Sequence, residues 1–154
     1  QGVQAVSSFV RNGGRVIAIE AATDFVAELF DLDISNLTSG LPNTEFYIPG
    51  SILRLELDSA SEINEGMRDE ISAWYWRSSM AYEVDDPRIR IVGRYGQGDP
   101  LLSGWVLGGE HIEGEAAILE ADIGEGSLVL FGFQPNYRAQ TVATWPLLFN
   151  AMRK

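Results

Sequence analysis

Four polar side chains follow a strand with no polar face, at a point where α/β proteins often hold a ligand. The strand is the apolar run Leu128–Phe131, and the polar residues after it are Gln134, Asn136, Arg138 and Gln140. Ligands of open α/β sheets bind where strands end and helices begin, so these residues are candidate ligand positions. The same residue types also cap helices and close turns. That structural interpretation is the one we favour.

A carboxylate, Glu20, ends another mostly apolar strand, at 15–20, just before a helix predicted at 23–32. A strand end that leads into a helix is a place where an α/β enzyme can hold a nucleophile. Glu20 could act there as a base, with Asp24 or Arg138 as its partner. The favoured alternative is structural: the carboxylate accepts hydrogen bonds from backbone amides at the start of the helix or pairs with an arginine.

Residues for other kinds of catalysis are scarce. The sequence has no cysteine and one histidine, His111, in a glycine-flanked turn. It therefore gives no support to a thiolate nucleophile, a Ser-His-Asp triad or a two-histidine zinc site, and His111 is interpreted as a surface residue. The glycines at 13–14 and 124–126 fall short of a dinucleotide-binding pattern. We expect no catalytic residue, no metal site and no cofactor in this chain.

Two tryptophans, Trp74 and Trp76, lie two residues apart on a predicted strand, with Tyr75 between them. Side chains two apart share one face of a strand, so the tryptophans lie together and Tyr75 lies opposite. Packing in the core is the favoured role, and an aromatic platform for a ligand is the alternative.

Composition limits the possible partners. The chain has 154 residues, 45% of them hydrophobic, and a net charge of −11. This size and composition suit one globular domain over 1–154. The negative charge repels phosphate backbones and gains nothing at an anionic membrane, so neither nucleic acid nor a membrane is an expected partner. No apolar stretch reaches the length of a membrane helix. A homo-oligomer of this chain is a possible assembly that the composition leaves open.

Hydrophobic periodicity predicts a three-layer α/β domain. Strands are expected at 15–20, 52–57, 71–76, 88–95, 101–107, 116–122 and 127–133. The last two form an antiparallel hairpin around Gly124 and Gly126, which can take the positive φ of a tight turn. Helices at 1–12 and 138–152 are expected to pack on the faces of a sheet that holds 15–20 and 127–133. The segment 33–50 is expected to be a long exposed loop.

Two expectations concern the ends of the chain. The last helix is predicted to bury one face, made of Val142, Trp145, Leu148, Phe149 and Met152, with Pro146 in its first turn or at a kink. The first helix already begins at the start of the sequence. We therefore expect the chain to be a fragment of a longer polypeptide, truncated at its N-terminal end, with a preceding strand missing.

Four blocks of sequence resemble a known family. They are FVRNGGRVIAIE at 9–20, IPGSILR at 48–54, DPLLSGW at 99–105 and LFGFQP at 130–135. Together they resemble the class I glutamine amidotransferase-like domain at the C-terminal end of bacterial M14-type zinc carboxypeptidases, and the likeness covers nearly the whole chain. The resemblance implies a flavodoxin-like fold, an upstream peptidase domain in the same polypeptide, and a periplasmic or extracellular location. Zinc is implied only in that peptidase domain.

The chain departs from the active amidotransferases at one decisive position. In those enzymes the strand that corresponds to 16–19 ends in a Gly-x-Cys-x-Gly elbow, whereas here Glu20 stands in place of the cysteine, flanked by Ala18 and Ala22. Without a thiol no glutaminyl thioester can form. The expected function is a non-catalytic accessory domain that positions a peptidase module or binds substrate. The alternative is a small hydrolase or transferase that uses Glu20 in a strand-end pocket.

Overall fold

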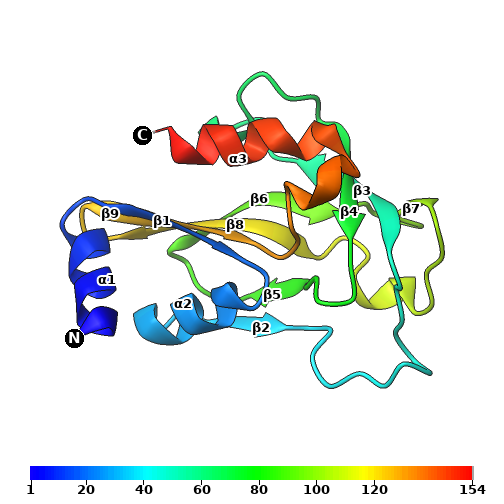
Figure 1. Ribbon diagram of the computed structural model, residues 1–154, viewed down its shortest axis with the longest axis horizontal. Coiled ribbons are helices and arrows are strands. Elements are labelled where there is room, and N and C mark those ends of the chain that lie inside the picture. The colour runs from blue at the N-terminus through cyan, green and yellow to red at the C-terminus, as the bar shows by residue number, and fades with distance from the viewer. Residues whose placement is uncertain (154) are drawn as a thin grey trace.

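Six strands form the main path of one open sheet, in the order β1-β9-β8-β6-β3-β4 (Figure 1). The computed structural model describes residues 1–153. Its strands are β1 (Arg15–Ile19), β2 (Ile34–Asn36), β3 (Ser51–Leu57), β4 (Glu70–Tyr75), β5 (Tyr82–Val84), β6 (Ile89–Tyr95), β7 (Leu101–Ser103), β8 (Ala116–Ile123) and β9 (Gly126–Phe131). Its α-helices are α1 (Gly2–Arg11), α2 (Ala22–Phe30) and α3 (Trp145–Met152). The predicted α/β fold class is confirmed.

The strands β1 and β9 lie side by side and run parallel, as predicted, with Arg15 opposite Ser127 and Ile19 opposite Phe131. The predicted hairpin is also present, because β8 and β9 pair antiparallel. All residues of β9 are buried. Its alternate side chains pack into two hydrophobic cores, one on each face of the sheet. A strand buried on both faces needs the continuous apolar run that the sequence has at this position.

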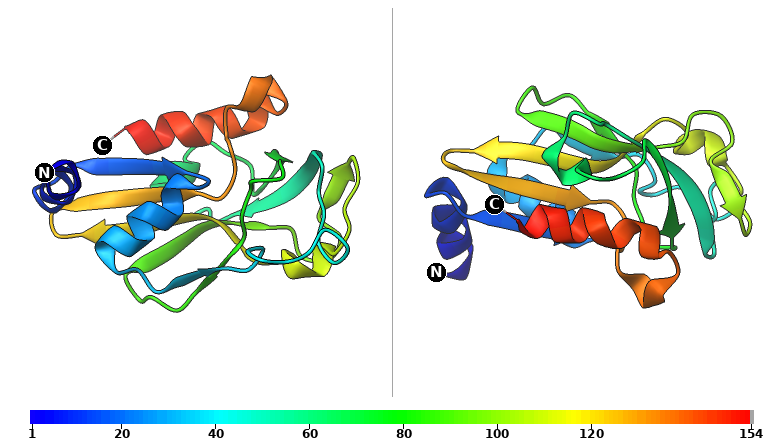
Figure 2. Two further views of the ribbon diagram at one scale, coloured as in Figure 1. Left: turned by 60° about the horizontal axis from the view of Figure 1, so that its bottom comes forward. Right: turned by 90° about the horizontal axis from the view of Figure 1, so that it is seen from above.

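One α-helix covers each face of the sheet, and the third lies at its end (Figures 1 and 2). Helix α3 lies over one face and α2 lies over the other, so the layers follow the prediction. Helix α1, which was expected on a face, instead stands at the end of the sheet where β1 begins, and Val10 is its only buried residue. No helix within residues 1–153 is both long and apolar enough to cross a membrane.

The predicted inward face of the last helix is wrong. The segment expected as one helix over 138–152 starts with the 3-10 turns η3 (Tyr137–Ala139) and η4 (Val142–Thr144), and α3 begins only at Trp145, with Pro146 in its first turn. The helix buries Leu147, Leu148 and Ala151 and exposes Trp145, Phe149 and Met152 of the predicted face. Val142, which lies in η4 before the helix, is exposed as well. Because α3 is apolar at every position except Asn150, its periodicity could not identify the side that meets the sheet.

The segment 33–50 is more ordered than the expected loop. Residues Ile34–Asn36 form β2, which pairs antiparallel with β5. Tyr47 forms an isolated bridge with Leu107, and Ile48 is buried in the core on the α3 side. The strand predicted at 101–107 is shorter than expected, because β7 ends at Ser103 just before Gly104, whose φ is 111°.

A buried carboxylate closes the C-terminal end of α2. The Asp86 carboxylate accepts hydrogen bonds from the Arg88 side chain and from the backbone amide of Asp33. The Arg88 guanidinium also donates to the carbonyls of Phe30 and Asp31, where the helix ends. Cations are favourable beside unpaired helix carbonyls. The Asp86–Arg88 ion pair therefore fixes both the end of α2 and the start of the segment that leads into β2.

Acid should weaken this contact at a predictable pH. Hydrogen bonding to the Arg88 guanidinium is the main reason that the pKa of Asp86 lies well below its ordinary value. A carboxyl with a lowered folded-state pKa contributes stability above its unfolded pKa of about 4, and that contribution is lost as the pH falls through the folded value. We expect the stability difference between the native chain and Asp86→Asn to be constant above about pH 5 and to shrink below about pH 4. Urea unfolding at pH 7 to 2.5 measures it. A stability difference that does not change with pH would contradict the role given to the Asp86 carboxylate. Asp122→Asn makes the same substitution at an exposed site and is the control, for which no such change with pH is expected.

Candidate functional site

The strand-end position at Glu20 has a left-handed backbone. Its φ is 49°, in a region that residues other than glycine seldom adopt. The Glu20 amide donates to the Phe131 carbonyl on β9 at 2.8 Å, and the Glu20 carbonyl accepts from the Thr23 amide and hydroxyl, both at 2.7 Å. The chain therefore makes a sharp, fixed turn between β1 and α2. Such a strained turn between a strand and a helix is the geometry of a nucleophile elbow.

The Glu20 carboxylate is buried, with 6% of the residue exposed. The Ser79 hydroxyl donates to Oε1 at 3.2 Å, and the Gln134 side-chain amide donates to Oε2 at 2.8 Å. The predicted partners, backbone amides at the start of α2 or an arginine, are wrong. The sharp turn places the carboxylate beside the turn that holds Ser79 and the residues that follow β9. Both carboxylate oxygens thus have a neutral hydrogen-bond donor.

Three buried tyrosines surround this elbow. The Tyr82 hydroxyl lies 2.6 Å from the Thr23 hydroxyl, the Tyr75 hydroxyl donates to the Ser79 carbonyl, and the Tyr95 hydroxyl donates to the Met80 carbonyl. Burial raises the pKa of all three phenols well above the ordinary value. They remain neutral at physiological pH. Within residues 1–153, the hydrogen-bond partners of Glu20 and of these tyrosines are all neutral groups.

The other residues predicted from the sequence are only partly brought together. Gln134 reaches Glu20, whereas Asn136 and Gln140 are exposed. The Arg138 guanidinium lies over the Tyr137 ring, 5.5 Å from its centroid. Asp24 lies in the first turn of α2 and lines a separate cavity of about 320 Å³ with Asp31 and Tyr82. Within the part of the chain that the structure describes, Glu20 and Gln134 are thus the one contact among the predicted positions.

The tryptophan pair forms a stack with a third ring. Trp74, Trp76 and Tyr137 lie nearly parallel, with centroids 5.7 to 6.0 Å apart. All three side chains are half-buried, and the Trp74 indole nitrogen is buried without a hydrogen-bond partner. The rings pack against one another outside the two hydrophobic cores, so the favoured role of packing in the core is not confirmed for the tryptophans, whereas Tyr75 on the opposite face is buried in a core. His111 is half-buried, with its Nε2 3.5 Å from a Glu45 carboxylate oxygen.

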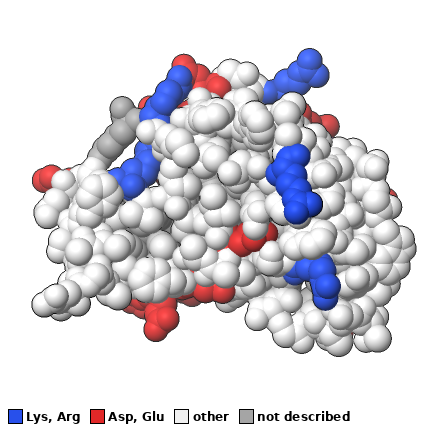
Figure 3. Space-filling model, in the orientation of Figure 1, with Lys and Arg blue, Asp and Glu red and all other residues white. Residues whose placement is uncertain are grey.

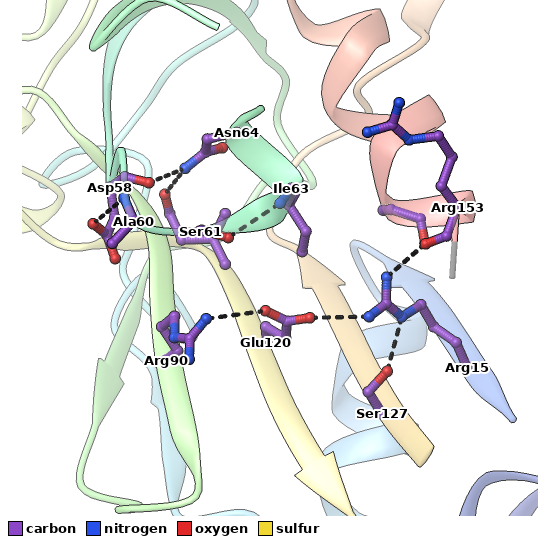
Figure 4. Close-up of polar contacts among 12 residues, drawn as sticks. Arg15, Asp58, Ala60, Ser61, Ile63, Asn64, Arg90, Glu120, Ser127 and Arg153 are labelled. Carbon is purple, nitrogen blue, oxygen red and sulfur yellow. Dashed lines mark hydrogen bonds and ion pairs between the residues drawn. The ribbon is translucent and has the colours of Figure 1, made fainter. Parts of the chain in front are cut away.

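A second polar cluster, which sequence reasoning missed, lies at the opposite end of β1 (Figure 4). Arg15 donates to the Ser127 hydroxyl at 2.8 Å, to Glu120 Oε1 at 3.2 Å and to the carbonyls of Ala151 and Arg153 at the end of α3. Arg90 lies 3.9 Å from the other Glu120 oxygen. The residues come from β1, β6, β8, β9 and the end of α3, so no local pattern in the sequence indicates the cluster.

Two cavities meet at Arg15, with volumes of about 520 and 630 Å³. Both also contact Ala60 and Glu62. Their charged side chains are mixed in sign: the smaller is lined by Arg15, Arg153, Glu62 and Glu65, and the larger by Arg15, Arg88, Arg90, Glu62, Glu120 and Asp122. Arginine keeps its proton, and the Glu120 carboxylate is paired with Arg15, so neither residue is a free acid or base, whereas Glu62, which lines both cavities, is exposed. Residues 1–153 also bring together no group of three or more histidine, aspartate or glutamate side chains that could hold a metal ion.

Comparison with known proteins supports the fold. No protein family and no curated sequence matches the chain. Among solved structures, it resembles part of a β-galactosidase from Bacillus circulans sp. alkalophilus, with a TM-score of 0.59, 14% identity, and coverage of 97% of this chain and 20% of that one. A protein assigned as part of a GMP synthase, from Thermoplasma acidophilum, also gives 0.59, with 9% identity and coverage of 97% and 61%. A glutamine amidotransferase from Thermotoga maritima gives 0.56, with 12% identity and coverage of 96% and 52%.

These similarities confirm the predicted class I glutamine amidotransferase-like, flavodoxin-like fold. At such low identity they concern the fold alone. The chain spans about a fifth of the β-galactosidase and about three fifths of the GMP synthase protein.

Proposed function

We propose that this chain is a non-catalytic accessory domain of an exported M14-type zinc carboxypeptidase, in which it positions the peptidase module or binds substrate. The observation that carries the proposal is the burial of the side chain at the sharp turn between β1 and α2. The amidotransferase-like fold keeps the strained turn after β1, but the side chain there is a buried carboxylate held by Ser79 and Gln134. A group that must attack or deprotonate a substrate has to reach it, and this one is enclosed.

Two further arguments support an accessory role. Glu20 lines none of five cavities described among residues 1–153. The same fold forms about a fifth of the β-galactosidase chain, so it occurs as one part of a larger hydrolase. The link to a carboxypeptidase, and with it the periplasmic or extracellular location, rests on the sequence resemblance at 9–20, 48–54, 99–105 and 130–135.

A buried functional carboxylate is the competing interpretation, and the strained φ of Glu20 is the observation in its favour. Strain at a position that glycine would occupy at less cost can mark a catalytic residue. In that case a hydrolase or transferase would need the Ser79 and Gln134 contacts to open when substrate binds.

The variant Glu20→Gln distinguishes the two functions. We expect it to lower the free energy of unfolding by about 1–2 kcal/mol. Each carboxylate oxygen of Glu20 accepts one hydrogen bond, from Ser79 or from Gln134, and the NH2 group of a glutamine cannot accept either of them. Thermal melting measures the loss. The native chain is expected neither to release ammonia from glutamine nor to remove C-terminal residues from peptides. If the native chain turns over either substrate and Glu20→Gln abolishes that turnover, the accessory-domain proposal is wrong. It is also wrong if Glu20→Gln melts at the same temperature as the native chain but loses any other hydrolytic activity that the native chain has.

A further inference from the structure

The segment 37–50 bounds a small cavity of about 160 Å³. Most of the lining comes from this segment, and the rest comes from Tyr75, which ends β4, and from Arg77. The segment is anchored at this place, because Ile48 is buried in the core and Tyr47 forms an isolated β-bridge. The cavity therefore lies between a fixed segment and the end of a strand.

The charge of this cavity differs from that of the others. Arg77 lines it and no carboxylate does, whereas each of four other cavities described among residues 1–153 is lined by at least one aspartate or glutamate. The chain has 22 acidic and only 11 basic residues, so its composition does not account for a cavity of this kind. At the lower right of Figure 3, where Figure 1 shows the segment 37–50, the surface is mostly uncharged, with basic side chains beside it. Such surroundings attract an anion.

Arg77 has the donors that an anion needs. Within residues 1–153 it forms no ion pair. Its guanidinium lies 6.0 Å from the centroid of the Tyr47 ring. A contact with an aromatic ring favours one position of the cation without using its five N–H donors for hydrogen bonds to oxygen. Those donors match the two oxygens of a carboxylate.

The rest of the lining limits the size and the polarity of a ligand. Leu41, Phe46 and Ile48 form an apolar wall, and Asn43 and Tyr47 add an uncharged amide and a hydroxyl. Sites for drug-sized ligands have volumes of about 300–1,000 Å³, well above the volume of this cavity. The cavity thus suits a molecule of a few heavy atoms that is negatively charged at one end and apolar at the other.

A buried tyrosine connects this cavity to the hydrogen-bond network at the turn between β1 and α2. Tyr75 is only 1% exposed, and its hydroxyl donates to the Ser79 carbonyl at 2.9 Å. The Ser79 hydroxyl in turn donates to the Glu20 carboxylate. Tyr75 is therefore held in one position before a ligand arrives, so one wall of the cavity is preorganised.

We propose that this cavity binds a carboxylate that carries a short apolar group. The carboxylate pairs with the Arg77 guanidinium, and the apolar group packs against Leu41, Phe46 and Ile48. Two sources share this chemistry: a free short-chain carboxylic acid and the C-terminal residue of a peptide. The peptide source rests on the proposed function, which includes substrate binding. The site itself rests on the lining of the cavity.

An NMR titration of the isotope-labelled 154-residue chain, resolved by residue, tests the proposal. We expect isovalerate to shift the amide signals of residues 38–48 with a Kd of about 1–10 mM. Isovaleramide has nearly the same shape without the charge. It should bind at least about tenfold more weakly, because the ion pair with Arg77 is lost.

Variants of two arginines locate the binding. Arg77→Met keeps the apolar stem and removes the charge, so the affinity for isovalerate should fall about 10- to 100-fold. Arg77→Lys restores the charge without the planar fork and should recover part of the affinity. Arg138→Met is the matched control: Arg138 is also exposed and lies 5.5 Å from the centroid of the Tyr137 ring, but it lines none of the five cavities. Its effect should stay within about twofold.

The tripeptide Ala-Ala-Leu and its C-terminal amide distinguish the two sources. If the free peptide binds and its amide does not, the ligand is the terminal residue of a peptide. If isovalerate binds and neither peptide does, the ligand is a free acid. Both results support a carboxylate site. The second removes peptide binding from the proposed function, whereas the lack of catalysis is judged separately by the turnover assays of the native chain and Glu20→Gln.

Three results would overturn the proposal. The first is the absence of signal shifts at residues 38–48 with isovalerate at about 50 mM, well above the expected Kd. The second is equal affinity for a carboxylate and its amide, in either the isovalerate or the peptide pair. The third is an equal loss of affinity in Arg77→Met and Arg138→Met, which would mean that the carboxylate responds to the overall charge and not to this cavity.

Discussion

The Gly126→Ala variant should be destabilised by about 3 kcal/mol or more, at the severe end for an added methyl group. Gly126 is buried at the start of β9. A Cβ atom there would lie 2.1 Å from the Val10 carbonyl oxygen and 2.2 Å from the Gly14 carbonyl oxygen. Both neighbours are backbone atoms that join α1 to β1, so neither can move without displacing the parallel β1–β9 pair. Urea unfolding, with circular dichroism as the probe, measures the loss.

The matched control is Gly2→Ala. It makes the same chemical change in the first residue of α1, where no other atom lies within 4 Å of the new methyl group. Its effect is expected to stay within about 0.5–1 kcal/mol and to be stabilising if anything, because alanine favours a helix over glycine. Equal effects from the two variants would mean that the contact between Gly126 and the α1–β1 connection does not hold the fold.

These glycines show what a sequence can reveal about a turn. Gly124 and Gly126 were both expected to supply positive φ, and Gly124 does so, with φ of 63°. Gly126 does not, since it is a strand residue whose missing side chain lets another segment approach. A turn residue is identified by its immediate neighbours in the sequence. A close approach depends on a segment more than 100 residues away, so composition near Gly126 could not distinguish the two roles.

The strands were predictable where the pattern is long. The β3 run alternates between buried and half-buried residues over all seven positions, and β9 is buried throughout, as their sequences indicate. The strands β2 and β5 were missed, because three residues are too few for a periodicity. The strand β2 pairs only with β5, and β5 pairs with β2 and β8, so both form through contacts that are distant in the sequence. The buried side of α3 was predicted wrongly because nearly all of its residues are apolar, so several sides of the helix could have faced the sheet.

The candidate site was predictable only at its strand ends. Glu20 and Gln134 were both singled out because they follow apolar strands, and parallel pairing of β1 with β9 brings them into contact. Ser79, the other partner of Glu20, lies in an irregular turn between β4 and β5 and follows no pattern. The Arg15 cluster joins β1, β8, β9 and α3, so it could be found only after the sheet order was known.

That cluster contributes to the position of α3 over the sheet, a helix in which Asn150 is the one polar residue. Arg15 is the first residue of β1, and its side chain crosses to the C-terminal end of α3, where it donates to the carbonyls of Ala151 and Arg153. A cation there satisfies unpaired helix carbonyls and interacts favourably with the helix dipole. The apolar contacts of α3 hold it against the sheet, whereas Arg15 determines where along the sheet the helix ends.

The Arg15→Met variant is therefore expected to lose about 2–4 kcal/mol of stability. Methionine keeps the apolar stem but leaves the two carbonyls unpaired and the largely buried Glu120 with only Arg90, 3.9 Å away. Arg90→Met is the control: its side chain is 55% exposed and the contact is long, so about 0.5 kcal/mol or less should be lost. Combining Arg15→Met with Glu120→Gln should recover part of the loss, because the orphaned charge is then removed. Urea unfolding of all four variants, including Glu120→Gln alone, gives the coupling. If the two losses simply add, Glu120 does not depend on Arg15, and the helix carbonyls account for the whole effect.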